Sequence, residues 1–257
     1  MAIAALVGLV ACSRGQHGLT LAGSTSLQPY AERWADAFRV GRPDLPVYVQ
    51  GGGSTAGVQA AISGAAQIGM SSRRLTAMEA MGVMAIPVAR DGLAIVVHPT
   101  NPLGNLSLEQ ARAIYSGAAA SWRDLGGPDL PITVITREEG SGTRAAFEDL
   151  VMGGRRIAAS ALVQDSTGAV RQMVASDPAA VGYVSLGLVD GTVKPLALGG
   201  IAASEDEIDA GRYPLVRPFL FVVPKNMSPA ARAFIDWVKG PEGRALTRRE
   251  GLLPPEV

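Results

Sequence analysis

The chain has 257 residues, of which 47% are hydrophobic and 18% charged, a balance typical of folded globular proteins. Basic and acidic side chains number 23 each, and aromatic residues make up only 5%, which argues against a nucleic-acid partner. The single cysteine excludes an internal disulfide and a metal site built from cysteines.

The amino terminus is predicted to be a processing signal. Residues 1–11, MAIAALVGLVA, are an uninterrupted apolar run that ends at the only cysteine, Cys12. A membrane-spanning helix needs about 20 residues, so this shorter run fits the hydrophobic part of a secretory signal. The sequence LVAC at 9–12 resembles the lipobox of bacterial lipoproteins, which implies cleavage before Cys12, lipidation of its thiol and anchoring to a membrane, with 12–18 as a tether. The alternative is a buried cysteine in an ordinary amino-terminal element.

The next part of the chain alternates between short β-rich runs and helical patterns. We predict strands over 20–23, 45–50 and 66–70, and helices over about 28–40 and 54–64. In the first helix, Tyr30, Trp34 and Phe38 recur at helical spacing. This β-α-β-α-β order implies a parallel sheet covered by helices.

The remainder repeats this alternation. Leu93–Val97 is an apolar run typical of a buried strand, and His98 is interpreted as a polar residue at its end. Residues 99–107 are rich in turn formers, which predicts a crossover between two lobes. Ser107 is expected to cap the helix that follows. Further strands are predicted at 131–137, near 161–165, at 180–187 and at 217–225, the last as the return crossing, with helices at 144–154, 168–176 and from Ser228 onward.

Three loops share one design, in which glycine, serine and threonine follow a strand and open a helix. They are GSTS at 23–26, GGGST at 51–55 and GSGT at 140–143. Glycine lets the backbone approach a ligand, hydroxyls donate hydrogen bonds, and helix N-termini attract anions. In any single loop, helix capping explains the Ser and Thr equally well. Three such loops together with Arg137, which ends a strand just before the third, favour a site for a small oxyanion.

Four successive segments resemble motifs of the PstS family, the phosphate-binding proteins of phosphate ABC transporters. They are AGSTSLQPYAERWADAF, VQGGGSTAGVQA, IGMSSRRL and TREEGSGTRAAFE, and the likeness covers most of residues 20–225. The resemblance implies an α/β fold of the periplasmic-binding-protein type II. Each of its two lobes would be a mixed, mostly parallel sheet flanked by helices, with the ligand in the cleft between them. We expect 19–95 and 219–257 to form lobe 1 and 96–218 to form lobe 2.

Carried over residue by residue, the resemblance implies a set of phosphate contacts. Thr25 and Ser26 would donate from the first loop, Ser54 from the second helix start, and Arg137 would neutralise the anion. The full expected set is Thr25, Ser26, Ser54, Ser72, Arg137, Ser141, Gly142 and Thr143.

Ser72 departs from the pattern of those family members that place an aspartate there to accept the proton of hydrogen phosphate. A carboxylate repels sulfate, whereas serine accepts the proton without adding that repulsion. Selectivity against sulfate is therefore less assured, and Glu138, Glu139 or Asp91 could supply the acceptor. The sequence leaves open whether Arg73 and Arg144 contact the ligand or are exposed side chains.

An enzyme is disfavoured. A hydrolase or phosphatase using Ser141 or Ser54 needs a base, and the only histidines are His17, in the tether, and His98. The sequence has no GxSxG elbow and no His/Asp cluster for two metals, so no cofactor or metal is expected. We expect a monomeric extracytoplasmic lipoprotein that passes inorganic phosphate to an ABC permease. The alternatives are a binding protein for molybdate, tungstate or sulfate, and a phosphate sensor that feeds no permease.

Overall fold

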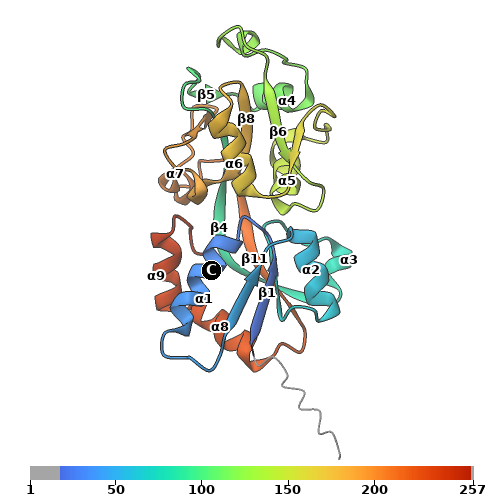
Figure 1. Cartoon of the computed structure of the whole chain (residues 1–257), viewed down its shortest axis with the longest axis vertical. Helices are drawn as coiled ribbons and strands as arrows, with labels where there is room; N and C mark the ends of the chain where they lie inside the picture. The colour runs from blue at the N-terminus through green and yellow to red at the C-terminus, as the bar shows by residue number, and fades with distance from the viewer. Residues whose placement is uncertain (1–17, 256–257) are drawn as a thin grey trace, which may run out of the picture.

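The computed structural model describes residues 18–255 as two lobes stacked along the long axis of the molecule (Figure 1). The predicted signal, Cys12 and His17 lie outside these residues. Within the described range, no helix has both the length and the apolar character that crossing a bilayer requires.

The lower lobe in Figure 1 is built on the predicted parallel sheet, whose strand order is β2-β1-β3. One face of this sheet is covered by α1 and α8, and the other by α2. Because parallel strands run the same way, their carboxyl ends meet at one edge, and the Gly/Ser loops leave the sheet there. The elements are β1 (Leu19–Gly23), α1 (Gln28–Arg39), β2 (Val47–Gln50), α2 (Ser54–Ser63), β3 (Ile68–Ser71), α3 (Ala77–Ala80), α8 (Pro229–Lys239) and α9 (Pro241–Arg249).

Two antiparallel strands join the lobes, β4 (Val83–Val97) and β11 (Val216–Pro224) (Figure 1). β4 pairs with β11 up to Gly92 and with a strand of the upper lobe from Leu93 onward, so the chain crosses inside an unbroken strand. The prediction that 99–107 forms the crossover is therefore wrong. That segment lies beyond the end of β4, and its Leu106 packs in the core of the upper lobe.

The upper lobe is again a sheet with helices on both faces. Its strands β8, β6 and β7 are mutually parallel, and β8 runs antiparallel to β4. The predicted capping of α4 by Ser107 is confirmed, because the Ser107 hydroxyl accepts from the N–H of Gln110 at 3.1 Å. The elements are β5 (Asn105–Leu106), α4 (Leu108–Ser116), β6 (Thr133–Arg137), α5 (Gly142–Phe147), β7 (Leu162–Gln164), α6 (Thr167–Ser176), β8 (Ala180–Ser185), β9 (Lys194–Pro195), β10 (Ala197–Leu198) and α7 (Glu205–Asp209).

Aromatic side chains hold the helices whose N-termini carry the loops. On α1, the Trp34 ring meets Phe221 of β11 edge-on, with centroids 5.8 Å apart. On α5, Phe147 stacks on Tyr183 of β8 at 4.2 Å. Each such ring, once buried, contributes roughly 1.5–3 kcal/mol. The loop positions are therefore fixed by the two cores.

Each lobe has its own hydrophobic core, and the two cores border each other along the crossing strands. Ala89 and Phe219 belong to the lower cluster, whereas Leu93 and Leu215 belong to the upper one. The predicted boundaries of the lobes, at 95/96 and 218/219, stay predictions. The segment around Leu253 also lies at this junction, since Leu253 exchanges backbone hydrogen bonds with Arg90 of β4.

Candidate functional site

The start of α2 and the end of β3 meet the start of α5 from the other lobe. Ser54 Oγ lies 3.3 Å from Ser72 Oγ and accepts a hydrogen bond from the Ser72 N–H at 3.0 Å. Gly142, the first residue of α5, packs so tightly on this pair that an added Cβ would stand 2.2 Å from Ser54 Oγ. Two helix N-termini from different lobes therefore face one another at the end of β3.

The loop before α1 joins the same cluster. The Thr143 hydroxyl donates to Ser26 Oγ at 3.4 Å, and Ser26 Oγ lies 3.0 Å from Ser24 Oγ. The side chains of Ser26, Ser54, Ser72 and Thr143 are all at most 1% exposed. Several hydroxyls thus gather out of water, where a hydrogen bond to an anion is strong.

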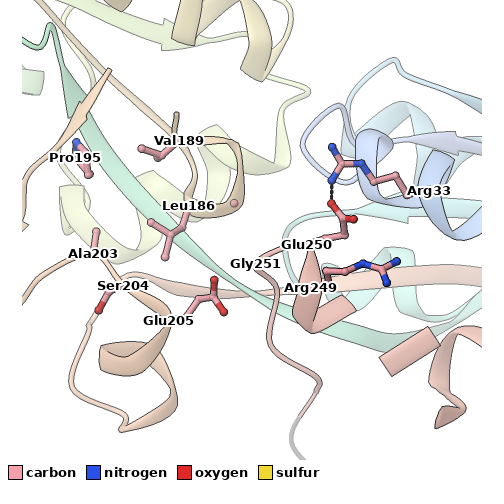
Figure 2. Close-up of a pocket in the computed structure, with 11 residues that line it drawn as sticks. Arg33, Leu186, Val189, Pro195, Ala203, Ser204, Glu205, Arg249, Glu250 and Gly251 are labelled. Carbon is pink, nitrogen blue, oxygen red and sulfur yellow. Dashed lines mark ion pairs between the residues drawn. The ribbon is translucent and has the colours of Figure 1, made fainter. Parts of the chain in front are cut away.

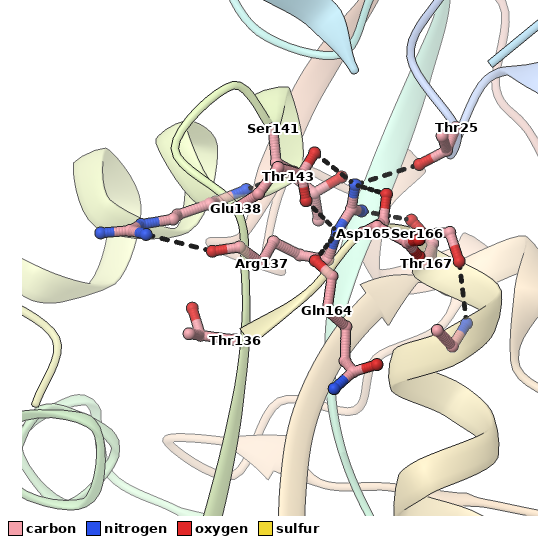
Figure 3. Close-up of polar contacts among 12 residues, drawn as sticks. Thr25, Thr136, Arg137, Glu138, Ser141, Thr143, Gln164, Asp165, Ser166 and Thr167 are labelled. Carbon is pink, nitrogen blue, oxygen red and sulfur yellow. Dashed lines mark hydrogen bonds and ion pairs between the residues drawn. The ribbon is translucent and has the colours of Figure 1, made fainter. Parts of the chain in front are cut away.

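Arg137 is the cation of this cluster and is itself 1% exposed (Figure 3). Its Nε and Nη2 donate to the two carboxylate oxygens of Glu138, each at 2.9 Å. Its Nη1 donates to Thr167 Oγ1 at 3.0 Å, and its Nη2 to Thr25 Oγ1 at 3.1 Å. Glu138 therefore occupies the Nε/Nη2 edge of the guanidinium, where the Gln164 carbonyl also accepts from Nε at 3.2 Å, and the Asp165 carbonyl accepts from Nη2 at 3.1 Å. The Nη1/Nη2 edge lies between the two threonine hydroxyls.

Comparison with known proteins places the chain in a family. Residues 10–242 match the profile of the PBP superfamily domain. The phosphate-binding protein PstS of Bacillus subtilis is 29% identical over 94% of this chain and 82% of its own length. A substrate-binding protein from Clostridium perfringens, whose crystal structure contains bound phosphate, is 34% identical, with a TM-score of 0.90 over 93% of this chain and 100% of the other.

The chain belongs to the PstS family of the PBP superfamily. An ABC-type phosphate transport receptor from Vibrio cholerae is a further relative, 37% identical over 92% of this chain and 100% of the other, with a TM-score of 0.77. The two-lobed α/β fold predicted for this PstS-family chain is confirmed.

Helix capping accounts for only one of the predicted hydroxyls in this PstS-family chain. The Ser141 hydroxyl caps α5 by accepting from the Arg144 N–H at 3.2 Å. Neither α1 nor α2 has a side-chain cap, so Thr25, Ser26 and Ser54 are not committed to that role. Capping leaves the O–H of Ser141 free to donate elsewhere.

The two arginines left open by the sequence brace the site. Arg73 donates to both carboxylate oxygens of Glu79, at 2.8 and 2.9 Å, and to Thr55 Oγ1 at 3.2 Å. This hydrogen-bonded ion pair lowers the pKa of Glu79 to about 2. Arg144 donates to Glu148 at 2.9 Å and to the Arg137 carbonyl at 3.1 Å, which fixes the backbone under the guanidinium.

Each of the three carboxylates considered as proton acceptors is either paired with an arginine or exposed. Both oxygens of Glu138 bind Arg137, and Glu139 is exposed. Asp91 accepts from Ser185 Oγ at 2.6 Å through Oδ1 and from Arg217 Nε at 2.8 Å through Oδ2. The acceptors at the centre are therefore the hydroxyls of residues such as Ser54 and Ser72.

Sequence reasoning missed Thr167. It is 1% exposed and opens α6, directly after β7 and the cap residue Ser166. The segment QDSTG at 164–168 repeats the strand, hydroxyl and glycine order of the other loops. That repetition is the signal that could have found it.

A separate groove lies beside the carboxyl-terminal segment (Figure 2). It is lined by residues of both lobes, including Leu186, Glu205 and Glu250, and by none of the predicted ligand residues. Its Arg33 is ion-paired with Glu250. Its two carboxylates, Glu205 and Glu250, are balanced by Arg33 and Arg249, so the groove has no excess of positive charge for a dianion.

Proposed function

We propose that this chain captures inorganic phosphate outside the cytoplasm and delivers it to an ABC importer. The observation that carries the proposal is Arg137, itself buried, which is held by Glu138 and donates to the hydroxyls of Thr25 and Thr167, one from each lobe. A tetrahedral anion accepts several hydrogen bonds at once, which suits donors that come from several directions. We assign the contacts to Thr25, Ser26, Ser54, Ser72, Arg137, Ser141, Gly142 and Thr143, and add Thr167.

The relatives support this choice of anion. The Bacillus subtilis protein is named a phosphate-binding protein, and the Clostridium perfringens structure holds phosphate. These relatives are substrate-binding proteins and not enzymes. Residues 18–255 contain no group of three or more His, Cys, Asp or Glu side chains placed to hold a metal ion.

Capture works by closure of the lobes. Arg137, Thr143 and Gly142 belong to the upper lobe, whereas Thr25, Ser26 and Ser54 belong to the lower one. An anion that enters the open form meets donors from both sides, and closure then removes water and strengthens each charge-assisted bond. The closed form is the one presented to the permease.

The location of the protein follows from its role. A binding protein of an importer works on the extracytoplasmic side. We propose that Cys12 is lipidated and holds the domain at the membrane through the tether at 12–18, and that the protein acts as a monomer. Mass spectrometry of the membrane fraction tests the anchor, which a peptide carrying unmodified Cys12 would contradict.

Calorimetric titration of the purified protein with phosphate, sulfate and molybdate tests the proposed function. Phosphate should bind most tightly, and Arg137→Ala should weaken binding by at least about 100-fold, because a hydrogen-bonded charge is lost. Arg171→Ala is the matched control, since Arg171 lies on α6 and forms a partly exposed ion pair with Asp190. If sulfate or molybdate bound more tightly than phosphate, that anion would be the ligand instead. Wild-type phosphate affinity in Arg137→Ala would reject the proposed site.

A further inference from the structure

Arg217, on the crossing strand β11, carries a buried donor that lacks an acceptor. Its side chain is 1% exposed. Nε donates to Asp91 Oδ2 at 2.8 Å, and Nη2 lies 2.8 Å from the same oxygen in an ion-pair contact without hydrogen-bond alignment. Nη1 has no partner among residues 18–255. Leaving a buried N–H unpaired costs about 1–3 kcal/mol, and more on a charged group, so its acceptor is a group that the chain itself does not supply.

Asp91 cannot take this donor. Its Oδ1 accepts the Ser185 hydroxyl at 2.6 Å, so it offers only Oδ2 to Arg217. Arg217 therefore contacts a single carboxylate oxygen of Asp91, whereas Arg137 binds both carboxylate oxygens of Glu138. Part of the Arg217 guanidinium stays available to a further acceptor.

The strand register places Arg217 at the edge of the sheet where the site lies. β11 runs antiparallel to β3, with Leu220 opposite Ser71, the last residue of β3. Arg217 precedes Leu220 by three residues and so lies past the end of β3. Ser72, which contacts Ser54 in the cluster, leaves β3 at the same edge.

Packing on the face of β11 agrees with the register. The Arg217 guanidinium lies 5.3 Å from the centroid of the Phe219 ring, and that ring packs on Tyr30 at 5.9 Å. Tyr30 lies in the first turn of α1, whose first residue, Gln28, follows Ser26 by two positions. Arg217 and the first turn of this helix thus both pack on the Phe219 ring.

The two buried guanidiniums also interact electrostatically. Burial lowers the pKa of Arg217, Asp91 opposes that effect, and the positive charge of Arg137 lowers it further. Two cations that repel each other in a dry site are both stabilised by an anion between them.

We propose that Arg217 is a second guanidinium of the anion site and that its free Nη1–H binds an oxygen of the bound tetrahedral anion. This inference rests on the proposed function and extends it, because it adds a cation from the crossing strand to donors that otherwise come from the two lobes. Since β11 joins the lobes, an anion held by Arg217 contacts both of them and the connection between them.

Calorimetric titration with phosphate tests this in two variants, because Arg217→Gln alone would leave Asp91 buried without its partner. Arg217→Lys keeps the charge but lacks Nη1, and we expect it to bind phosphate about 10-fold more weakly. Asp91→Asn/Arg217→Gln removes the pair together, and the loss should reach about 100-fold. Arg171→Gln is the control, because Arg171 is ion-paired with Asp190 and lies outside the site; its affinity should stay within about threefold of wild type.

Wild-type affinity in folded Arg217→Lys and in the folded double variant would overturn the inference while leaving the proposed function intact. Absence of phosphate binding by the wild-type protein would instead overturn the proposed function. If the variants do not fold, a crystal structure of the wild-type phosphate complex decides. Nη1 should then lie about 2.8 Å from a phosphate oxygen, and an Nη1 bonded only to water would reject the assignment.

Discussion

The basic side chains around the site differ in what is left of each guanidinium once its protein partners are counted. Arg73 donates to both carboxylate oxygens of Glu79, and Arg144 donates to Glu148 and to the Arg137 carbonyl. Arg137 is also paired with a carboxylate, that of Glu138, and donates to the carbonyls of Gln164 and Asp165. Its Nη1 and Nη2 nevertheless reach the hydroxyls of Thr167 and Thr25, which can both accept from it and donate onward to an anion. Proximity to the loops is therefore not enough to make an arginine a ligand, because its donors must also reach hydroxyls of both lobes.

Ser72 offers a residue-level test of selectivity. It is 1% exposed and contacts Ser54, so an aspartate there would present a carboxylate to the anion. A carboxylate accepts the proton of hydrogen phosphate and repels the fully ionised sulfate. Ser72→Asp should raise the ratio of phosphate affinity to sulfate affinity by about 10-fold or more, measured by parallel titrations.

The matched variant for that test is Ser72→Ala, which removes the hydroxyl and adds no charge. It should weaken phosphate and sulfate binding by similar factors. A ratio that stays constant in Ser72→Asp would remove Ser72 from the residues that set selectivity.

At the scale of elements, much of the lower lobe could be predicted because its signals are local. The strand at Leu19–Gly23, the helix that opens at Ser54 and the aromatic stripe on α1 follow from short-range pattern. The first ten residues of β4 escaped prediction because Pro87 interrupts the pattern. The strand accommodates Pro87 at an irregularity in register opposite Phe219 and Leu220. The helical pattern predicted from Ser228 onward is likewise divided in the structure into two helices, α8 and α9, which are separated at Gly240 before Pro241.

The hydroxyls and the Arg137 cation of the proposed site are visible in the sequence, whereas the ion pairs of the other arginines are not. A Gly/Ser/Thr loop between a strand and a helix is visible in sequence, as at Gly140–Thr143. The partner of Arg73 is Glu79 on the short helix α3, and that of Arg217 is Asp91 on another strand. Such pairings exist only after the elements have packed, so no local pattern records them.

The contact between helix starts yields a prediction at Gly142. An added Cβ would stand 2.2 Å from Ser54 Oγ and 2.6 Å from Ser72 Oγ, so Gly142→Ala should hold the lobes apart. Overpacking of this kind costs about 1–3 kcal/mol, and we expect a loss of phosphate affinity of about 5- to 100-fold by calorimetry. Gly140→Ala is the control, because a Cβ there would meet only Thr55 Cβ, at 3.9 Å. Equal affinities of the two variants would contradict this account.

On the scale of the whole molecule, the described conformation is closed. Four hydrogen bonds join the lobes directly: Arg137 Nη2 to Thr25 Oγ1 at 3.1 Å, Thr143 Oγ1 to Ser26 Oγ at 3.4 Å, Thr55 N–H to the Gly140 carbonyl at 3.1 Å, and the pair of hydroxyls of Tyr30 and Ser185 at 3.3 Å. Only two strands connect the lobes, so a small change in β4 and β11 can separate these contacts. An anion that bridges the same groups favours the closed state by its difference in affinity between the two states.

Closure can be measured on the intact protein by small-angle X-ray scattering. Saturating phosphate should lower the radius of gyration of the wild-type protein, because ligand-bound molecules populate the closed form. Arg137→Ala should show at most about half of this decrease at 100 times the wild-type Kd, since binding weakened by 100-fold or more leaves the site no more than half occupied. Phosphate at 100 times its Kd should also stabilise the wild type against unfolding by about 2.7 kcal/mol. Stabilisation without a change in radius would mean that phosphate binds a protein that is closed already, and the hinge would then have no part in capture.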